Sequence, residues 1–213
     1  MITLTKSRAI VSVGRDDLLR FRAETLDRRD WACLPRFVDA SLLESFARRF
    51  EDIGFRSRHH DRIGGELALT DPQAGEALCL LLNDPVVLSF MEILTGSSPL
   101  GCFSGRVYRF APGGACLHEW HDDVIEERRV AFTLNLSRDL YQGGALLLRS
   151  RRTGQTQAIE NRGFGDALLF RVAADLEHRS EPVTGAVPKT AFAGWFRASP
   201  RFQDGLRNAL AAR

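Results

Sequence analysis

The chain has 213 residues, of which 44% are hydrophobic and 26% are charged. That composition is typical of an ordinary soluble globular protein with room for a sizeable core. The 29 Lys and Arg residues nearly balance the 27 Asp and Glu residues, so the net charge of +2 gives no reason to expect binding to nucleic acid or to a membrane.

The cysteines and the N-terminus bear on the cellular compartment. The four cysteines are scattered and form no C-x-x-C pair, which argues against a disulfide framework and against a zinc knuckle. The first residues contain no apolar stretch of signal-peptide length, and no run approaches the roughly 20 apolar residues that span a bilayer. We therefore expect a cytoplasmic protein with no membrane segment.

Helices are predicted in the first half of the chain. Asp39 or Ser41 can cap a helix whose apolar residues recur at helical spacing as far as Phe50. A second helix is expected from Asp71 and Pro72, because proline is favoured at the first helical position.

Two further features complete the first half. The sequence Asn-Asp-Pro at 83–85 interrupts the second helix, and a third helix follows and ends at Gly96. The polar stretch at 54–69 is expected to be mostly loop, with a short strand at 66–69 and with His59 and His60 in solvent.

From residue 102 onward, short apolar runs alternate with glycine-rich and proline-containing turns. Eight strands are predicted, at 103–110, 116–122, 130–136, 144–149, 156–159, 167–171, 177–183 and 190–197. Eight short strands after a helical layer indicate a mainly β fold with flanking helices, a double-stranded β-helix (jelly roll) braced by N-terminal helices. We expect one domain over 1–213, with helical support over 1–100 and the jelly-roll core over 101–200.

His121 and Asp123 form an H-x-D pair, and His178 lies 55 residues beyond Asp123. On a strand or at its end, residues i and i+2 point to the same side, so His121 and Asp123 can share one metal ion. Two imidazoles and one carboxylate on one face of Fe(II) leave three positions open. A different hypothesis is a helical His118-x-x-His121 zinc pair, which the glycine-rich residues before it and the strand-like residues after it disfavour.

Six segments around these residues resemble the 2-oxoglutarate and Fe(II)-dependent oxygenases, in particular their prolyl-4-hydroxylase-like branch. The resemblance covers roughly residues 103–197, and its order and spacing are those of the family. The segments are RVYRFAPGG at 106–114, HDD at 121–123, AFTLNLS at 131–137, YQGGALLL at 141–148, GDALLF at 165–170, and His178 followed by PVTG at 182–185, Lys189 and GWF at 194–196.

The resemblance implies roles for particular residues. His121, Asp123 and His178 would hold Fe(II), and Lys189 would pair with the distal carboxylate of 2-oxoglutarate through a single ammonium. Tyr108 and Asn135 are candidate hydrogen-bond partners for the co-substrate, and the hydroxyl of Thr190 is a further candidate. Where many relatives carry a tyrosine in the first strand, this chain has Phe110. Trp195 is expected near the co-substrate end of the barrel.

The resemblance also implies the reaction, in which 2-oxoglutarate and dioxygen are converted to succinate and carbon dioxide while a substrate C–H bond is hydroxylated. Asp123 favours hydroxylation over halogenation, because halogenating relatives lack that carboxylate. The substrate is expected to be an amino acid, a peptide or another small molecule, and the segments 56–69 and 124–129 are expected to shape its entrance. The alternative is a non-catalytic, cupin-like jelly roll that only binds or senses a metal. The sequence predicts neither the substrate nor the oligomeric state.

Overall fold

The computed structural model describes residues 1–198 except 62, 115 and 126. Within these residues, one sheet of eleven strands runs in the order β10-β9-β12-β7-β5-β6-β13-β8-β11-β3, and β4 pairs with β5. The strands are β3 (Trp31–Leu34), β4 (Phe55–His60), β5 (Gly64–Leu69), β6 (Cys102–Phe110), β7 (Leu117–His121), β8 (Arg128–Asn135), β9 (Leu146–Ser150), β10 (Thr156–Ile159), β11 (Ala167–Arg171), β12 (Leu176–Ser180) and β13 (Lys189–Arg197).

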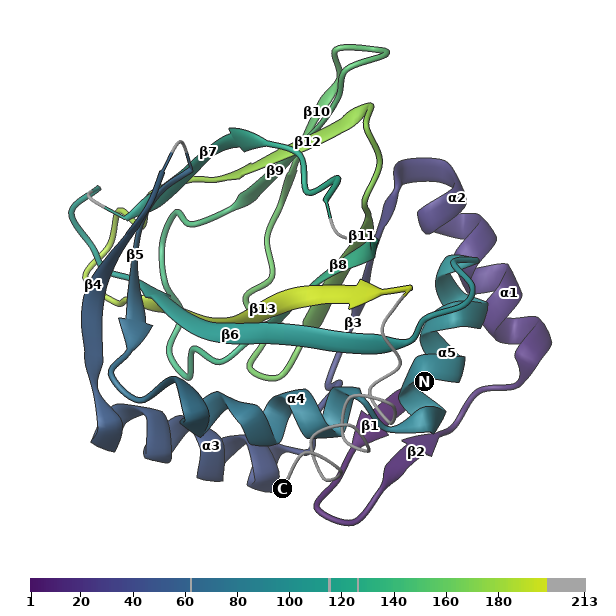
Figure 1. Cartoon of the computed structure of the whole chain (residues 1–213), viewed down its shortest axis with the longest axis horizontal. Helices are drawn as coiled ribbons and strands as arrows, with labels where there is room; N and C mark the ends of the chain where they lie inside the picture. The colour runs from purple at the N-terminus through teal and green to yellow at the C-terminus, as the bar shows by residue number, and fades with distance from the viewer. Residues whose placement is uncertain (62, 115, 126, 199–213) are drawn as a thin grey trace, which may run out of the picture.

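The sheet is strongly curled, so that its two ends form two facing layers. Figure 1 shows β7, β9, β10 and β12 above the layer formed by β6, β13 and β8. The layers join where β5 pairs with β6 on one side and with β7 on the other. This arrangement confirms the predicted jelly roll, and all eight strands predicted after residue 102 are present.

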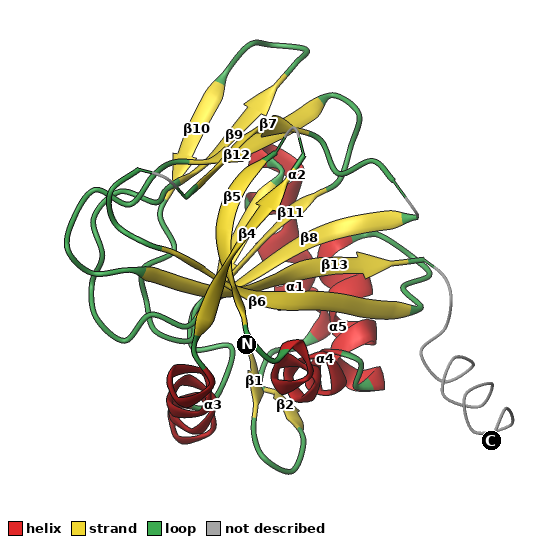
Figure 2. Cartoon of the chain, turned by 60° about the vertical axis from the view of Figure 1, so that its left-hand side comes forward, coloured by secondary structure: helices red, strands yellow, loops and turns green. Residues whose placement is uncertain are grey.

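Helices cover one face of the larger layer, as Figure 2 shows. They are α1 (Arg15–Glu24), α2 (Leu26–Arg29), α3 (Ala40–Ile53), the 3-10 turn η1 (Pro72–Gly75), α4 (Glu76–Leu82) and α5 (Pro85–Thr95). The predicted start of α3 is confirmed, because the Asp39 carboxylate accepts hydrogen bonds from the backbone N–H groups of Ser41 and Leu42 at 3.0 and 3.2 Å. The predicted end of α5 is also confirmed, with Gly96 in the left-handed conformation at φ 71°.

The alternation of side chains along β13 separates the core from the interior of the barrel. Phe192 and Phe196 are fully buried in the core shared with the helices. Ala191, Ala193 and Trp195 point the other way and line the cavity. Ala191 and Ala193 on the inner face are small and leave room for a ligand, and the large side chains on the outer face anchor the sheet to the helices.

The first hundred residues contribute more than helices. β3 extends the large layer by pairing with β11, and a small separate hairpin is formed by β1 (Ile2–Leu4) and β2 (Ala9–Val11). The expectation of a loop over most of 54–69 is wrong, because β4 and β5 form a hairpin there. β4 is an edge strand with exposed charged side chains, so it lacks the apolar alternation by which strands are recognised.

The longest helix in the described part of the chain, α3, has 14 residues. No single helix there is long and apolar enough to cross a bilayer; one pair, Pro72–Leu82 with Pro85–Thr95, meets the criteria together but is bent by 69° at its break.

Candidate metal centre

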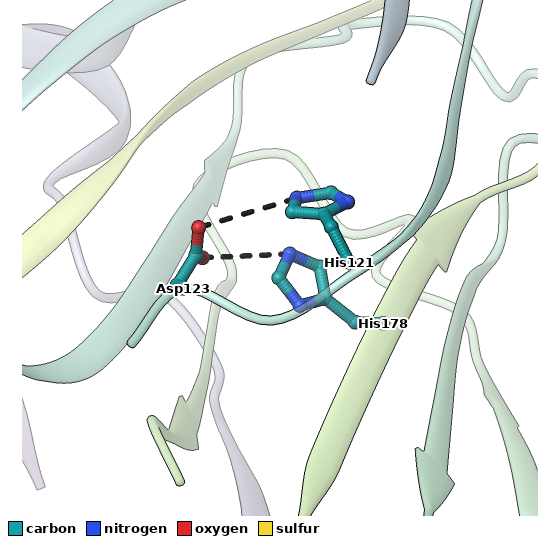
Figure 3. A group of neighbouring side chains, drawn as sticks. All are labelled: His121, Asp123 and His178. Atoms are coloured by element: carbon teal, nitrogen blue, oxygen red, sulfur yellow. Dashed lines mark ion pairs between the residues drawn. The ribbon is translucent and has the colours of Figure 1, made fainter. Parts of the chain in front are cut away.

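His121 and His178 lie directly opposite one another in the antiparallel pair β7–β12. Their ring centroids are 4.2 Å apart. Asp123 follows β7 and turns its carboxylate toward both rings, with Oδ1 4.0 Å from Nε2 of His121 and Oδ2 3.5 Å from Nε2 of His178 (Figure 3). One ligand atom from each residue lies within 4.8 Å of the other two, so the structure brings together the three residues selected from the sequence.

The ring nitrogens of His121 and His178 can face a metal. Nδ1 of His121 lies 2.6 Å from the backbone carbonyl of Glu119, which makes Nδ1 the N–H donor and leaves the lone pair of Nε2 free toward Asp123. Burial lowers the pKa of His178 to about 4, so its ring is neutral at ordinary pH. Two imidazoles and a carboxylate form the donor set that Fe(II) takes in non-haem oxygenases.

Asp123 is held in place from its outer side. Nε1 of Trp195 donates a 2.6 Å hydrogen bond to Oδ2, and Nη1 of Arg128 lies 3.2 Å from Oδ1. The Arg128 guanidinium also stacks over the Trp195 ring at 3.5 Å. These contacts fix the rotamer of a 7% exposed carboxylate. Trp195 therefore lies against the candidate metal ligands, and no sequence motif points to the contact that Arg128 makes with Asp123.

Lys189 lies inside the same cavity with 6% of its surface exposed. Its Nζ donates a 2.6 Å hydrogen bond to the carbonyl of Gly144 and lies 5.8 Å from the ring centroids of Phe110 and Tyr141. Burial lowers its pKa to about 8. A buried ammonium with one neutral partner has a strong preference for an anion.

Tyr108 and Asn135 also line the cavity. Burial raises the pKa of Tyr108, so its hydroxyl stays protonated and can donate. The Asn135 amide is already engaged with the backbone, donating to the carbonyl of Gly163 and accepting from the N–H of Ser137. The hydroxyl of Thr190 does not face the cavity, because it accepts a hydrogen bond from Arg109. Its candidacy as a co-substrate contact is therefore wrong.

A second charged cluster lies beside these three residues, and no motif in the sequence points to it. The Glu66 side chain is fully buried on β5 and forms a two-point ion pair with Arg106, with both N···O distances at 2.8 Å. Nε2 of His60 lies 3.0 Å from one Glu66 oxygen, and Nε2 of His118 lies 3.4 Å from the other. Burial opposes ionisation of Glu66, but the contacts with His118 and Arg106 outweigh it and hold the pKa of Glu66 well below its usual range.

This cluster corrects two expectations. His60 belongs to β4 and contacts Glu66, so the solvated loop expected for it is wrong. The helical zinc pair is also wrong, because residues Leu117–His121 form a strand and the His118 ring turns to Glu66. Burial lowers the pKa of His118, which keeps this ring neutral.

The cavity that contains these residues has a volume of about 350 Å³. Arg58, His60 and Ile63 from the β4–β5 hairpin line it, as do Ile125 and Arg128 from the segment after Asp123. Both segments that were expected to shape an entrance therefore contribute to its wall. The volume lies at the lower end of the range for ligand pockets.

Comparison with known proteins agrees with this geometry. Residues 105–197 match the family model described as the 2OG-Fe(II) oxygenase superfamily. No curated protein matches the sequence.

Three solved structures illustrate the similarity of fold. A prolyl hydroxylase from Trichoplax adhaerens, in complex with a hypoxia inducible factor oxygen degradation domain peptide fragment, has a TM-score of 0.67 at 16% identity, over 86% of this chain and 90% of that one. A Pseudomonas putida prolyl-4-hydroxylase has a TM-score of 0.65 at 18% identity, over 86% and 100%. An oxidoreductase of the 2OG-Fe(II) oxygenase family from Burkholderia pseudomallei has a TM-score of 0.65 at 15% identity, over 90% and 94%.

Proposed function

We propose that this chain, a 2OG-Fe(II) oxygenase by its residues 105–197, holds Fe(II) with His121, Asp123 and His178 and hydroxylates a C–H bond of an amino acid, a peptide or another small molecule. The observation that supports the proposal most strongly is the convergence of the three ligand atoms within 4.8 Å, in a cavity that also contains the buried ammonium of Lys189. A bound iron with 2-oxoglutarate and dioxygen supplies the oxidation, and succinate and carbon dioxide are released.

The protein residues bind, orient and shield. His121 and His178 offer Nε2 lone pairs, and Asp123 offers a carboxylate whose direction is set by Trp195 and Arg128. Lys189 would hold the distal carboxylate of 2-oxoglutarate by exchanging its hydrogen bond to Gly144 for an ion pair. The surrounding apolar wall keeps this ion pair away from water, which strengthens it.

Tyr108 and Asn135 are proposed to contribute to the co-substrate site less directly. Tyr108 can donate a hydrogen bond to the keto acid from a buried position in the cavity wall. Asn135 would act mainly by fixing the backbone at Gly163 and Ser137, where its amide is already engaged.

The alternative of a non-catalytic, metal-binding jelly roll differs from this proposal at Lys189, which such a protein would not need. The comparisons give it no support. A small-molecule or peptidyl substrate and dioxygen are the partners that the proposal requires. A cytoplasmic location remains a prediction, supported by the free thiols of Cys33, Cys79, Cys102 and Cys116.

The experiment is an anaerobic titration of the purified protein with Fe(II) and 2-oxoglutarate, followed by admission of air. We expect a weak charge-transfer band in the visible region and the formation of succinate. Lys189→Ala should weaken the affinity for 2-oxoglutarate by about 100-fold or more. Removal of the charged partner of a buried carboxylate lowers the binding free energy by about 3 kcal/mol. The matched control is Lys6→Ala, an exposed lysine outside the cavity, which should leave that affinity unchanged. If neither a band nor succinate appears, the non-catalytic alternative is favoured.

A further inference from the structure

The side chains that line the cavity carry more positive than negative charge. Among the described residues that line it, one has a carboxylate, Asp123. Four have cationic side chains, namely Arg58, Arg106, Arg128 and Lys189. A bound divalent iron would add further positive charge, so the cavity favours anionic ligands.

Three of the four cations already have a role. Arg128 pairs with Asp123, and Arg106 pairs with Glu66 through Nε and Nη2. Lys189 is assigned to 2-oxoglutarate by the proposed function. Arg58 is different, because within the described parts of the chain its guanidinium forms no hydrogen bond or ion pair.

The register of the β4–β5 hairpin explains why Arg58 is left over. Arg58 lies directly opposite Glu66, so the two side chains emerge on the same face of the sheet and would be natural partners. The Glu66 carboxylate is already saturated, with Arg106 on both oxygens and with His60 and His118 beside them.

Gly64 lets the two imidazoles reach Glu66. Gly64 on β5 is the direct cross-strand neighbour of His60 on β4 and of His118 on β7. A Cβ at Gly64 would lie 2.2 Å from the carbonyl oxygen of Leu117, so no larger residue fits the close approach of β5 to β7. With no side chain between them, the His60 and His118 rings approach to 6.3 Å between centroids and flank Glu66.

We infer that Arg58 binds a carboxylate of the substrate at the mouth of the cavity, and that the substrate of this oxygenase is a small carboxylic acid with an apolar body. This inference rests on the proposed function, because only an oxygenase would use the bound acid as a substrate. Ile63 and the 56% exposed Ile125 line the same cavity and give the apolar body a surface to contact. Nη1 of Arg106, which forms no hydrogen bond within the described residues, adds a second donor on the same wall.

Matched ligands and matched variants test this inference. The probes are N-acetyl-leucine and N-acetyl-phenylalanine, each compared with its uncharged primary carboxamide. Their binding is measured by calorimetry on the protein saturated with Fe(II) and 2-oxoglutarate without oxygen. The variants are Arg58→Gln and Arg58→Lys, and the control is Arg56→Gln. Arg56 and Arg58 are both exposed arginines on β4, but Arg56 is absent from the cavity wall.

We expect the acids to bind at least about tenfold more tightly than the carboxamides, a difference of about 1.4 kcal/mol. Arg58→Gln should abolish that preference, Arg58→Lys should restore part of it, and Arg56→Gln should leave it unchanged. The inference is overturned if acids and carboxamides bind equally, if no acid binds, or if Arg56→Gln has the same effect as Arg58→Gln.

The failure of the proposed function would look different. The charge-transfer band with 2-oxoglutarate does not depend on Arg58 and should form in all three variants. If the band is absent, the proposed function fails. The comparison of acids with carboxamides still decides whether Arg58 is an anion site, because calorimetry needs no turnover.

Discussion

His121 and His178, 57 positions apart in the sequence, are direct cross-strand neighbours on β7 and β12, with ring centroids 4.2 Å apart. A one-residue slip in the register of these strands would turn one imidazole to the outer face of the sheet. The proposed metal site therefore depends on strand pairing as much as on the identity of the ligands. The contacts that fix Asp123 beside the two histidines matter for the same reason.

Removal of the carboxylate should abolish high-affinity metal binding. Loss of a residue that only supports a metal ligand typically lowers metal affinity by about 10- to 100-fold. We expect Asp123→Ala to lower the affinity for Fe(II) by more than this. Metal content after equilibrium dialysis checks this prediction. Asp139→Ala, which changes an exposed aspartate outside the cavity, is the control. Equal metal content in Asp123→Ala and the wild type would exclude Asp123 as a ligand.

Trp195 should act through Asp123. Trp195→Phe removes the N–H that donates to Oδ2 at 2.6 Å but keeps an aromatic ring under Arg128. We expect about 10- to 100-fold weaker Fe(II) binding or slower turnover. The control is Trp120→Phe, because Trp120 stacks with Arg149 and Arg179 and does not line the cavity. The two variants would behave alike if Trp195 only filled space.

In the protein without bound 2-oxoglutarate, the buried Lys189 should lower the free energy of unfolding. Its pKa falls from 10.5 to about 8 on burial, so between those values the unfolded chain binds more protons than the folded one, and stability rises with pH. Below pH 8 the buried ammonium lowers the free energy of unfolding by about 3 kcal/mol relative to a neutral group. Its hydrogen bond to Gly144 offsets part of this loss. Lys189→Met should therefore be more stable than the wild type at pH 7, and the difference should shrink above pH 8. Urea unfolding at pH 7 and pH 9.5 measures it, and a less stable variant at pH 7 contradicts the prediction.

Glu66 should have the opposite effect on stability. Glu66→Gln leaves the half-buried Arg106 without its anionic partner, and we expect a loss of about 2 to 3 kcal/mol in the free energy of unfolding. The matched control is Glu44→Gln, which breaks the exposed pair with Arg138 and should cost at most about 1 kcal/mol. A similar small loss for both variants would show that the Glu66 cluster is not a structural anchor.

The barrel strands and the candidate ligand pair His121 and Asp123 could be recognised in the sequence because both depend on local patterns. Alternating apolar runs separated by glycine-rich turns identified β6 to β13, and the H-x-D pair required only that residues i and i+2 share a side. The pairing of His178 with His121 came from the resemblance to the family, and the structure confirms it.

The rest of the site depends on tertiary contacts with no local signature. β4 cannot be recognised from the sequence, because an edge strand of charged residues resembles a loop. Arg106 reaches Glu66 across 40 residues of sequence, and Trp195 reaches Asp123 across 72. Thr190 directly follows Lys189 on β13. Because successive side chains on a strand point to opposite faces, the Thr190 hydroxyl points away from the face that carries Lys189.

A crystal grown without oxygen in the presence of Fe(II) and 2-oxoglutarate, measured with anomalous scattering at the iron edge, tests the central claim most directly. We predict one strong anomalous peak bonded to Nε2 of His121, Nε2 of His178 and one oxygen of Asp123, with the distal carboxylate of the keto acid at Nζ of Lys189. A peak at the Glu66 cluster instead, or a keto acid bound away from Lys189, would contradict the account.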